Sequence, residues 1–169
     1  MSLKAFRAAL AVTTAITGHA FAAERYDLSV QADAFFSSPS SPDHLSATVK
    51  GASCEDAAFT FSIHRGGARL FQQIVPMASV FDCEEVVHRT PDEVRWYVLH
   101  ILNGGVAVVR AVDRQCHPKA IGCWVAPSFE KLQRLNAPLV CFVTGRESDS
   151  CVAYDPETKA VVEVRKTSE

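Results

Sequence analysis

The sequence lacks the short motifs that carry most familiar chemistry. It has no C-x-x-C pair, which excludes the common zinc-knuckle and thiol-oxidoreductase patterns. It also has no G-x-S-x-G run for a nucleophile-elbow hydrolase, no H-x-x-H or H-E-x-x-H spacing for a metal and no phosphate-binding loop. We therefore expect no metal site and no cofactor, and these absences favour a protein that is not an enzyme.

A surplus of positive charge and a long apolar run are missing as well. The 169 residues have a net charge of −2, which leaves no basic footprint for nucleic-acid binding. After the first segment, the longest apolar stretch, residues 106–112, has the length of a strand, so no membrane span is predicted. A hydrophobic content of 48% excludes a disordered chain and is sufficient for the core of one domain.

The first segment has the pattern of a secretory signal peptide. Lys4 and Arg7 precede an apolar run over residues 8–16, and Ala20-Phe21-Ala22 supplies the small residues that a signal peptidase reads. A buried N-terminal helix is the alternative, but it needs no such ending. We expect residues 1–22 to be removed, leaving 23–169 as a single periplasmic or extracellular domain. Because the removed piece contains two cations and no acid, the net charge then changes from −2 to −4.

Cysteine is the unusual abundance in this chain. An even number of cysteines in an exported protein indicates disulfides, and six allow 15 pairings. We expect pairing between near neighbours in the sequence, because each such pair flanks a short loop or hairpin. The expected bridges are Cys54–Cys83, Cys116–Cys123 and Cys141–Cys151.

Alternating apolar and polar residues predict most of the fold. Half-buried strands are expected over residues 26–32, 45–51, 59–63 and 70–75, with a turn at Arg65-Gly66-Gly67 between the last two. Residues 106–112 are rich in β-branched side chains and predict a central strand. Strands near 139–144, 151–154 and 160–164 form a C-terminal meander. Sequential hairpins of this kind predict an α+β fold with a mainly antiparallel, disulfide-stapled sheet.

One long and one short helix complete the expected fold. Thr90-Pro91-Asp92-Glu93 forms a capping box with proline in the first turn, which predicts a helix over about 91–103 that ends in a left-handed glycine cap. Its buried stripe should consist of Val94, Tyr97, Val98, Ile101 and Leu102, with Trp96 and His100 one turn apart outside the stripe. The short helix is expected over about 129–135.

The candidate functional residues are contact residues and not catalytic ones. Trp96 and Trp124 are of the type that dominates protein interfaces, and a bridged Cys116–Cys123 loop presents His117, Lys119 and Ile121 on a pre-ordered backbone. These features favour a small exported protein that binds or inhibits a protein partner, such as a cell-wall-degrading toxin or a hydrolase. Nothing in the sequence indicates its oligomeric state.

Two other functions remain open from the sequence. One is a small secreted hydrolase that uses carboxylates and histidines brought together by the fold, drawn from His64, His88, His100 and His117. The other is a structural component of the cell envelope or a secreted effector. The spatial arrangement of the histidines separates the first of these from a binding protein.

Overall fold

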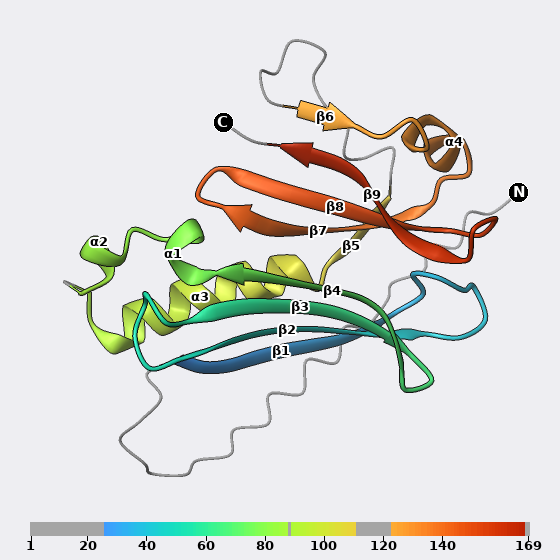
Figure 1. Ribbon diagram of the computed structural model, residues 1–169. Coiled ribbons are helices and arrows are strands. Elements are labelled where there is room, and N and C mark those ends of the chain that lie inside the picture. Colours follow the sequence, from blue (N-terminus) through green and yellow to red (C-terminus); the bar gives the residue numbers. More distant parts are fainter. Residues whose placement is uncertain (1–25, 88, 111–122, 168–169) are drawn as a thin grey trace, which may run out of the picture.

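The fold is α+β, with two antiparallel sheets and one long helix, as the sequence predicts. A computed structural model describes residues 26–87, 89–110 and 123–167 (Figure 1). No helix in this part of the chain is long and apolar enough to cross a membrane. The elements are β1 (Tyr26–Ala34), β2 (Asp43–Gly51), β3 (Ala58–Arg65), β4 (Ala68–Pro76), α1 (Met77–Val80), α2 (Cys83–Val87), α3 (Pro91–Gly105), β5 (Val108–Arg110), β6 (Cys123–Val125), α4 (Phe129–Arg134), β7 (Pro138–Gly145), β8 (Ser148–Asp155) and β9 (Ala160–Thr167).

The first sheet is a simple meander in the order β1-β2-β3-β4. Strands β1 and β2 alternate as predicted, so that Leu45, Ala47 and Val49 of β2 are buried while their neighbours face outward. Strand β4 does not alternate in this way, because most of its side chains are exposed and only Val75 is buried. The β3–β4 turn places Gly66 and Gly67 at φ of 53° and 83°, the left-handed region that glycine adopts without strain. Gly51 ends β2 where a Cβ atom would lie 2.3 Å from the Cα of Ala57, so only glycine fits there.

The second sheet has the order β5-β7-β8-β9-β6. Strands β7, β8 and β9 form the predicted C-terminal meander. The prediction of a central strand over 106–112 is wrong, because β5 spans only Val108–Arg110 and pairs with β7 at the edge of the sheet, as far as the chain is described. Val106 and Ala107 do not belong to the strand, because Val106 is the C-cap of α3 and the Ala107 N–H still donates to the Gly104 carbonyl of the helix. Residues 111–112 lie outside the described residues.

The core lies between the two sheets and α3. Two parts of the molecule cover the buried face of the first sheet. Helix α3 packs over β1 and β2, and the second sheet lies beside α3 and approaches β4 (Figure 1). Phe61 of β3 stacks on Phe142 of β7 with ring centroids 4.8 Å apart, and Phe71 of β4 meets the same ring at 5.7 Å. A smaller apolar cluster, with Phe129 and Leu132 of α4, covers the other face of the second sheet.

Both predicted helices are present, with corrected boundaries. Helix α3 starts with the expected capping box but continues to Gly105, and neither Gly104 nor Gly105 adopts a positive φ, so the predicted left-handed cap is absent. The following residue, Val106, is buried, and the helical path carries it into the core. Helix α4 spans Phe129–Arg134. Helices α1 and α2 were not expected, because four and five residues are too few to establish a helical period.

Two of the three expected disulfides are confirmed. Cys54 bonds to Cys83 and so ties the β2–β3 connection to the start of α2. Cys141 bonds to Cys151 across directly paired positions of β7 and β8. The expected partner pair Cys116–Cys123 cannot be placed, since Cys116 lies outside the described residues.

A polar contact joins the sheets at the tip of the β3–β4 hairpin. The Arg65 guanidinium lies 5.2 Å from the centre of the Tyr154 ring of β8 and donates through Nε to Asp43 Oδ1 at 3.0 Å. Asp43 is fully buried and also accepts from the backbone N–H and the hydroxyl of Ser37. The buried carboxylate therefore has three donors, which offset the loss of its hydration.

Candidate functional site

Helix α3 has two faces of different character. Val94, Val98 and Leu102 are buried against the first sheet. On the other side, Trp96 is 66% exposed and stacks almost parallel on His100, with ring centroids 5.6 Å apart. Tyr97 was predicted in the buried stripe but is 45% exposed, with its ring edge-on against Phe81. The helix thus presents two large aromatic side chains to the surface.

The start of α3 is fixed by its capping box. The Thr90 backbone N–H and hydroxyl both donate to Glu93 Oε2 at 2.8 Å, and the Glu93 N–H donates to the Thr90 hydroxyl at 3.3 Å. The bond from the Thr90 backbone is the main cause that lowers the pKa of Glu93, with the Thr90 hydroxyl next. Because Trp96 and Tyr97 lie within two turns of this cap, they project from a well-anchored segment of helix.

A first hollow of about 240 Å³ lies beside this segment, between α3, the α1–α2 segment and the β7–β8 turn. Figure 1 shows α1 next to this turn. Asp82 pairs with Arg146 across it at 3.4 Å, which links residues 64 positions apart in the chain. The Cys54–Cys83 bridge holds the adjoining end of α2. The hollow is lined by Val80, Phe81, Asp82, Glu85, Arg89, Val94, Tyr97, Arg146 and Glu147.

A second, more open hollow of about 520 Å³ adjoins the first. It is lined by Arg89, Asp92, Glu93, Trp96 and Tyr97, so Arg89 and Tyr97 belong to both. We call the combined surface of these two hollows the α3 face. It combines exposed aromatic rings and arginines, which are enriched in protein interfaces, with carboxylates, which are more typical of the polar rim of an interface.

A third hollow of about 250 Å³ follows the same helix toward its end. His100, Ile101 and Gly104 of α3 form one wall, and Cys141 and Asp149 of the second sheet lie on the other. The carboxylate of Asp149 is already engaged by neighbouring side chains. This hollow therefore offers fewer free polar groups than the α3 face.

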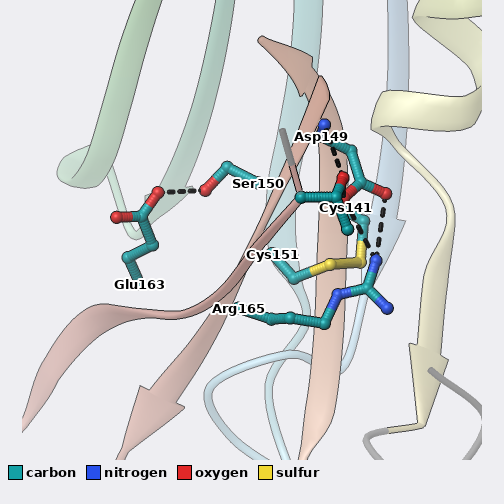
Figure 2. A network of polar contacts seen from close by, with 7 residues as sticks. Cys141, Asp149, Ser150, Cys151, Glu163 and Arg165 are labelled. Atoms are coloured by element: carbon teal, nitrogen blue, oxygen red, sulfur yellow. Dashed lines mark hydrogen bonds and ion pairs between the residues drawn. A yellow bond between two sulfur atoms is a disulfide. The ribbon is translucent and has the colours of Figure 1, made fainter. Parts of the chain in front are cut away.

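Figure 2 shows the polar network to which Asp149 belongs. The buried Arg165 Nη2 donates to both carboxylate oxygens of Asp149, at 3.1 and 3.0 Å. The Thr167 hydroxyl donates to Asp149 Oδ1 at 2.6 Å and accepts from the Asp149 backbone N–H at 3.0 Å. On the same strands the Ser150 hydroxyl donates to Glu163, and the Cys141–Cys151 bridge lies beside the network. These contacts lock the β7, β8 and β9 strands together, and we interpret the network as structural.

The binding residues expected from the sequence are divided between separate elements. Trp96 lies on the α3 face, whereas Trp124 lies on β6, with β9 and β8 between it and the β7 strand that contacts α3. Trp124 is 49% exposed. His117, Lys119 and Ile121 lie outside the described residues, so their part in binding stays a prediction.

The described histidines among those proposed for a hydrolase likewise lie on separate elements. His100 stacks on Trp96, and His64 lies on β3 directly opposite His44 of β2. His44, which the sequence did not single out, donates a hydrogen bond from Nδ1 to Asp33 Oδ1 at 2.9 Å on an exposed part of the sheet. His88 and His117 lie outside the described residues. Among the described residues, no three acidic, histidine or cysteine side chains are grouped to hold a metal ion.

Only part of the α3 face can be predicted from the sequence. The spacing of Trp96 and His100 at i and i+4 indicates that they share one side of a helix. The hollows beside them, by contrast, require Asp82 and Arg146 to meet through the tertiary fold. No protein-family model, curated protein or solved structure matches this chain.

Proposed function

We propose that this is a small exported protein that binds a partner protein through the α3 face. The observation that carries the proposal is the exposure of Trp96 and Tyr97 on a capped helix beside two adjoining hollows. Tryptophan, tyrosine and arginine supply most hot spots in protein interfaces, and the α3 face contains all three types. An inhibitor or immunity protein against a cell-wall-degrading toxin or hydrolase fits this description.

The anchoring of the α3 face favours binding energetically. Ordering a flexible side chain at an interface costs about 0.5–1.5 kcal/mol, and a pre-ordered surface avoids part of that cost. The Trp96–His100 stack, the Tyr97–Phe81 contact and the helix cap restrict these side chains before any partner arrives. A surface prepared in this way suits tight binding of one partner.

Export is the second part of the proposal. Disulfides persist in oxidising compartments, and the two bridges of this chain are compatible with such a location. N-terminal sequencing of the protein recovered from periplasm and medium tests it. We expect the mature chain to begin at Ala23, and recovery of a reduced, uncleaved chain from the cytosol would contradict export.

Affinity capture with matched variants tests the binding site. The wild-type protein should retain one partner at a fixed stoichiometry from extracts of the producing organism or its competitors. The double variant Trp96→Ala with Tyr97→Ala should lose it, because the two exposed rings are removed from a helix whose buried face is unchanged. The control is Phe35→Ala, which removes a ring that is 58% exposed near the end of β1.

The capture experiment also shows which of the two tryptophans, Trp96 or Trp124, belongs to the binding site. If Trp124→Ala removes the partner while the α3 variant retains it, binding occurs at β6 or the preceding loop and the α3 face is not the site. Circular dichroism of each variant establishes that the fold persists. Loss of the partner from the Phe35→Ala control as well as from the α3 variant would count against a localised site.

A further inference from the structure

The α3 face has an uneven balance of charge. Five carboxylates line its two hollows, against two arginines, which gives a net charge of −3 over a small area. The arginines are Arg89 and Arg146, and the carboxylates belong to Asp82, Glu85, Asp92, Glu93 and Glu147. Since the whole chain has a net charge of only −2, negative charge is concentrated at this face.

Some of these carboxylates are already engaged within the protein. Asp82 pairs with Arg146, and Glu93 accepts two hydrogen bonds in the capping box. Within the described residues, Glu85, Asp92 and Glu147 form no ion pair. Three exposed carboxylates are thus available to a positively charged group on a partner.

Trp96 lines the second hollow beside Asp92 and Glu93 with much of its surface open, and the first hollow, which contains Glu85 and Glu147, adjoins it through Arg89 and Tyr97. Stacking on His100 occupies one side of the indole ring, while the residue as a whole is 66% exposed. Tryptophan is the best aromatic partner for a lysine or arginine cation placed over its ring. An open indole ring on a surface with a net negative charge therefore provides both the π surface and the negative potential that a cation prefers.

From these observations we infer that the α3 face recognises a basic protein surface, with lysine or arginine side chains of the partner lying over Trp96 and among Glu85, Asp92 and Glu147. This inference rests on the proposed function and specifies the chemistry of its partner. A second copy of this chain is disfavoured as the occupant, because two α3 faces of the same negative charge would repel each other across a two-fold contact. Complementary charge also speeds association at low salt.

Fluorescence of Trp96 provides a direct test. The chain has two tryptophans, so Trp124→Phe leaves Trp96 as the only one. Decalysine is added to this single-tryptophan protein, and decaglutamate serves as the opposite-charge control. We expect decalysine to change the Trp96 emission in a saturable way that weakens as salt is raised, and decaglutamate to have no effect.

Two charge variants of equal net charge show whether the local carboxylates matter. In the single-tryptophan background, Glu85→Gln, Asp92→Asn and Glu147→Gln together should weaken decalysine binding by about tenfold, since each removes one cation contact at the α3 face. The matched control removes three exposed acids elsewhere, by Asp27→Asn, Glu55→Gln and Glu130→Gln. Equal weakening in both variants would show a general charge effect and overturn the inference.

The captured partner separates this inference from the proposed function. If Trp96→Ala with Tyr97→Ala abolishes capture but the triple Gln/Asn variant leaves it unchanged, the α3 face binds a partner of another chemistry, and only the cationic inference fails. If neither variant affects capture, both fail. Concentration-dependent sedimentation that Trp96→Ala abolishes would identify a second copy as the occupant and overturn the cationic inference.

Discussion

The region around the start of α3 and the second sheet each contain one disulfide, but the bridges act in different settings. Cys141 and Cys151 face each other on strands that are already paired along their length, and side-chain bonds reinforce the same strands. Cys54 and Cys83 instead join a connection between strands to a five-residue helix that has little pairing of its own. The comparison teaches that one bridge adds to an existing structure, whereas the other holds a wall of the α3 face in place.

Removal of the Cys54–Cys83 bridge should have the largest effect. In the loop-entropy model a loop of this length contributes roughly 3.6 kcal/mol, an upper estimate. We expect Cys54→Ser with Cys83→Ser to lower the free energy of unfolding by up to this amount and to weaken partner capture, because α2 is released beside the first hollow. Urea unfolding followed by circular dichroism measures the stability change.

Removal of the Cys141–Cys151 bridge is the matched test. The shorter loop contributes roughly 2.8 kcal/mol in the same model. Cys141→Ser with Cys151→Ser should therefore cost less stability and leave Trp96 emission and partner capture unchanged. If this variant loses the partner while the Cys54–Cys83 variant retains it, the roles assigned to the two bridges are reversed.

The cap of α3 should have a smaller effect than either bridge. Thr90→Ala removes the side chain that accepts from Glu93 and donates to its carboxylate, and loss of such a cap costs about 1 kcal/mol. We expect local fraying that raises hydrogen exchange at the first turn of α3 and leaves the second sheet protected. Faster exchange in β7 and β8 would mean that the two regions are energetically coupled.

Lowering the pH should reduce the stability of both regions, and we expect this effect to be smaller than those of the substitutions above. Glu93 has its pKa lowered below the ordinary 4.5, mainly by the Thr90 backbone N–H. Asp155, at the end of β8, has its pKa lowered below 3.8, mainly by the Glu157 backbone N–H, and the nearby Lys131 of α4 adds a bond of 3.2 Å. Because both values are lowered on folding, each carboxylate stabilises the fold above its ordinary pKa, and this contribution is lost as pH falls through the lowered value.

Side-chain NMR titration of Thr90→Ala separates the two carboxylates. The pKa of Glu93 should rise toward its ordinary value, since the Thr90 hydroxyl no longer donates to it, while the pKa of Asp155 should not change. A shift of both would contradict the independence of the two regions. Lys131, whose pKa is raised mainly by its hydrogen bond to Glu157, serves as an internal reference for the α4 side.

The parts of the fold that the sequence predicts are those governed by local chemistry. Alternation of Leu45, Ala47 and Val49 with polar neighbours defines β2, and the Thr90 capping box defines where α3 begins. These signals depend on residues a few positions apart. These signals can therefore be recognised in the sequence without knowledge of the tertiary structure.

The missed parts depend on distant residues. The edge position of β5 and the extension of α3 through Gly105 follow from packing against the second sheet and not from β-branched composition. Arg165 meets Asp149 only because β8 and β9 pair in a particular register, and Asp82 meets Arg146 only because the segment that follows α1 lies against the β7–β8 turn. The i, i+4 spacing predicts that Trp96 and His100 share one side of the helix. No local pattern predicts the hollows beside them.

The Arg65 contact at the hairpin tip has a mechanical consequence. The hydrophobic attraction that brings Phe61 and Phe142 together has no direction of its own, so it fixes the lateral position of the two sheets less strictly than a directional polar contact does. Arg65 is held by the buried Asp43 of the first sheet and lies over the Tyr154 ring of the second. Sliding would separate the guanidinium from that ring, so this contact resists shear and sets the alignment of the two layers.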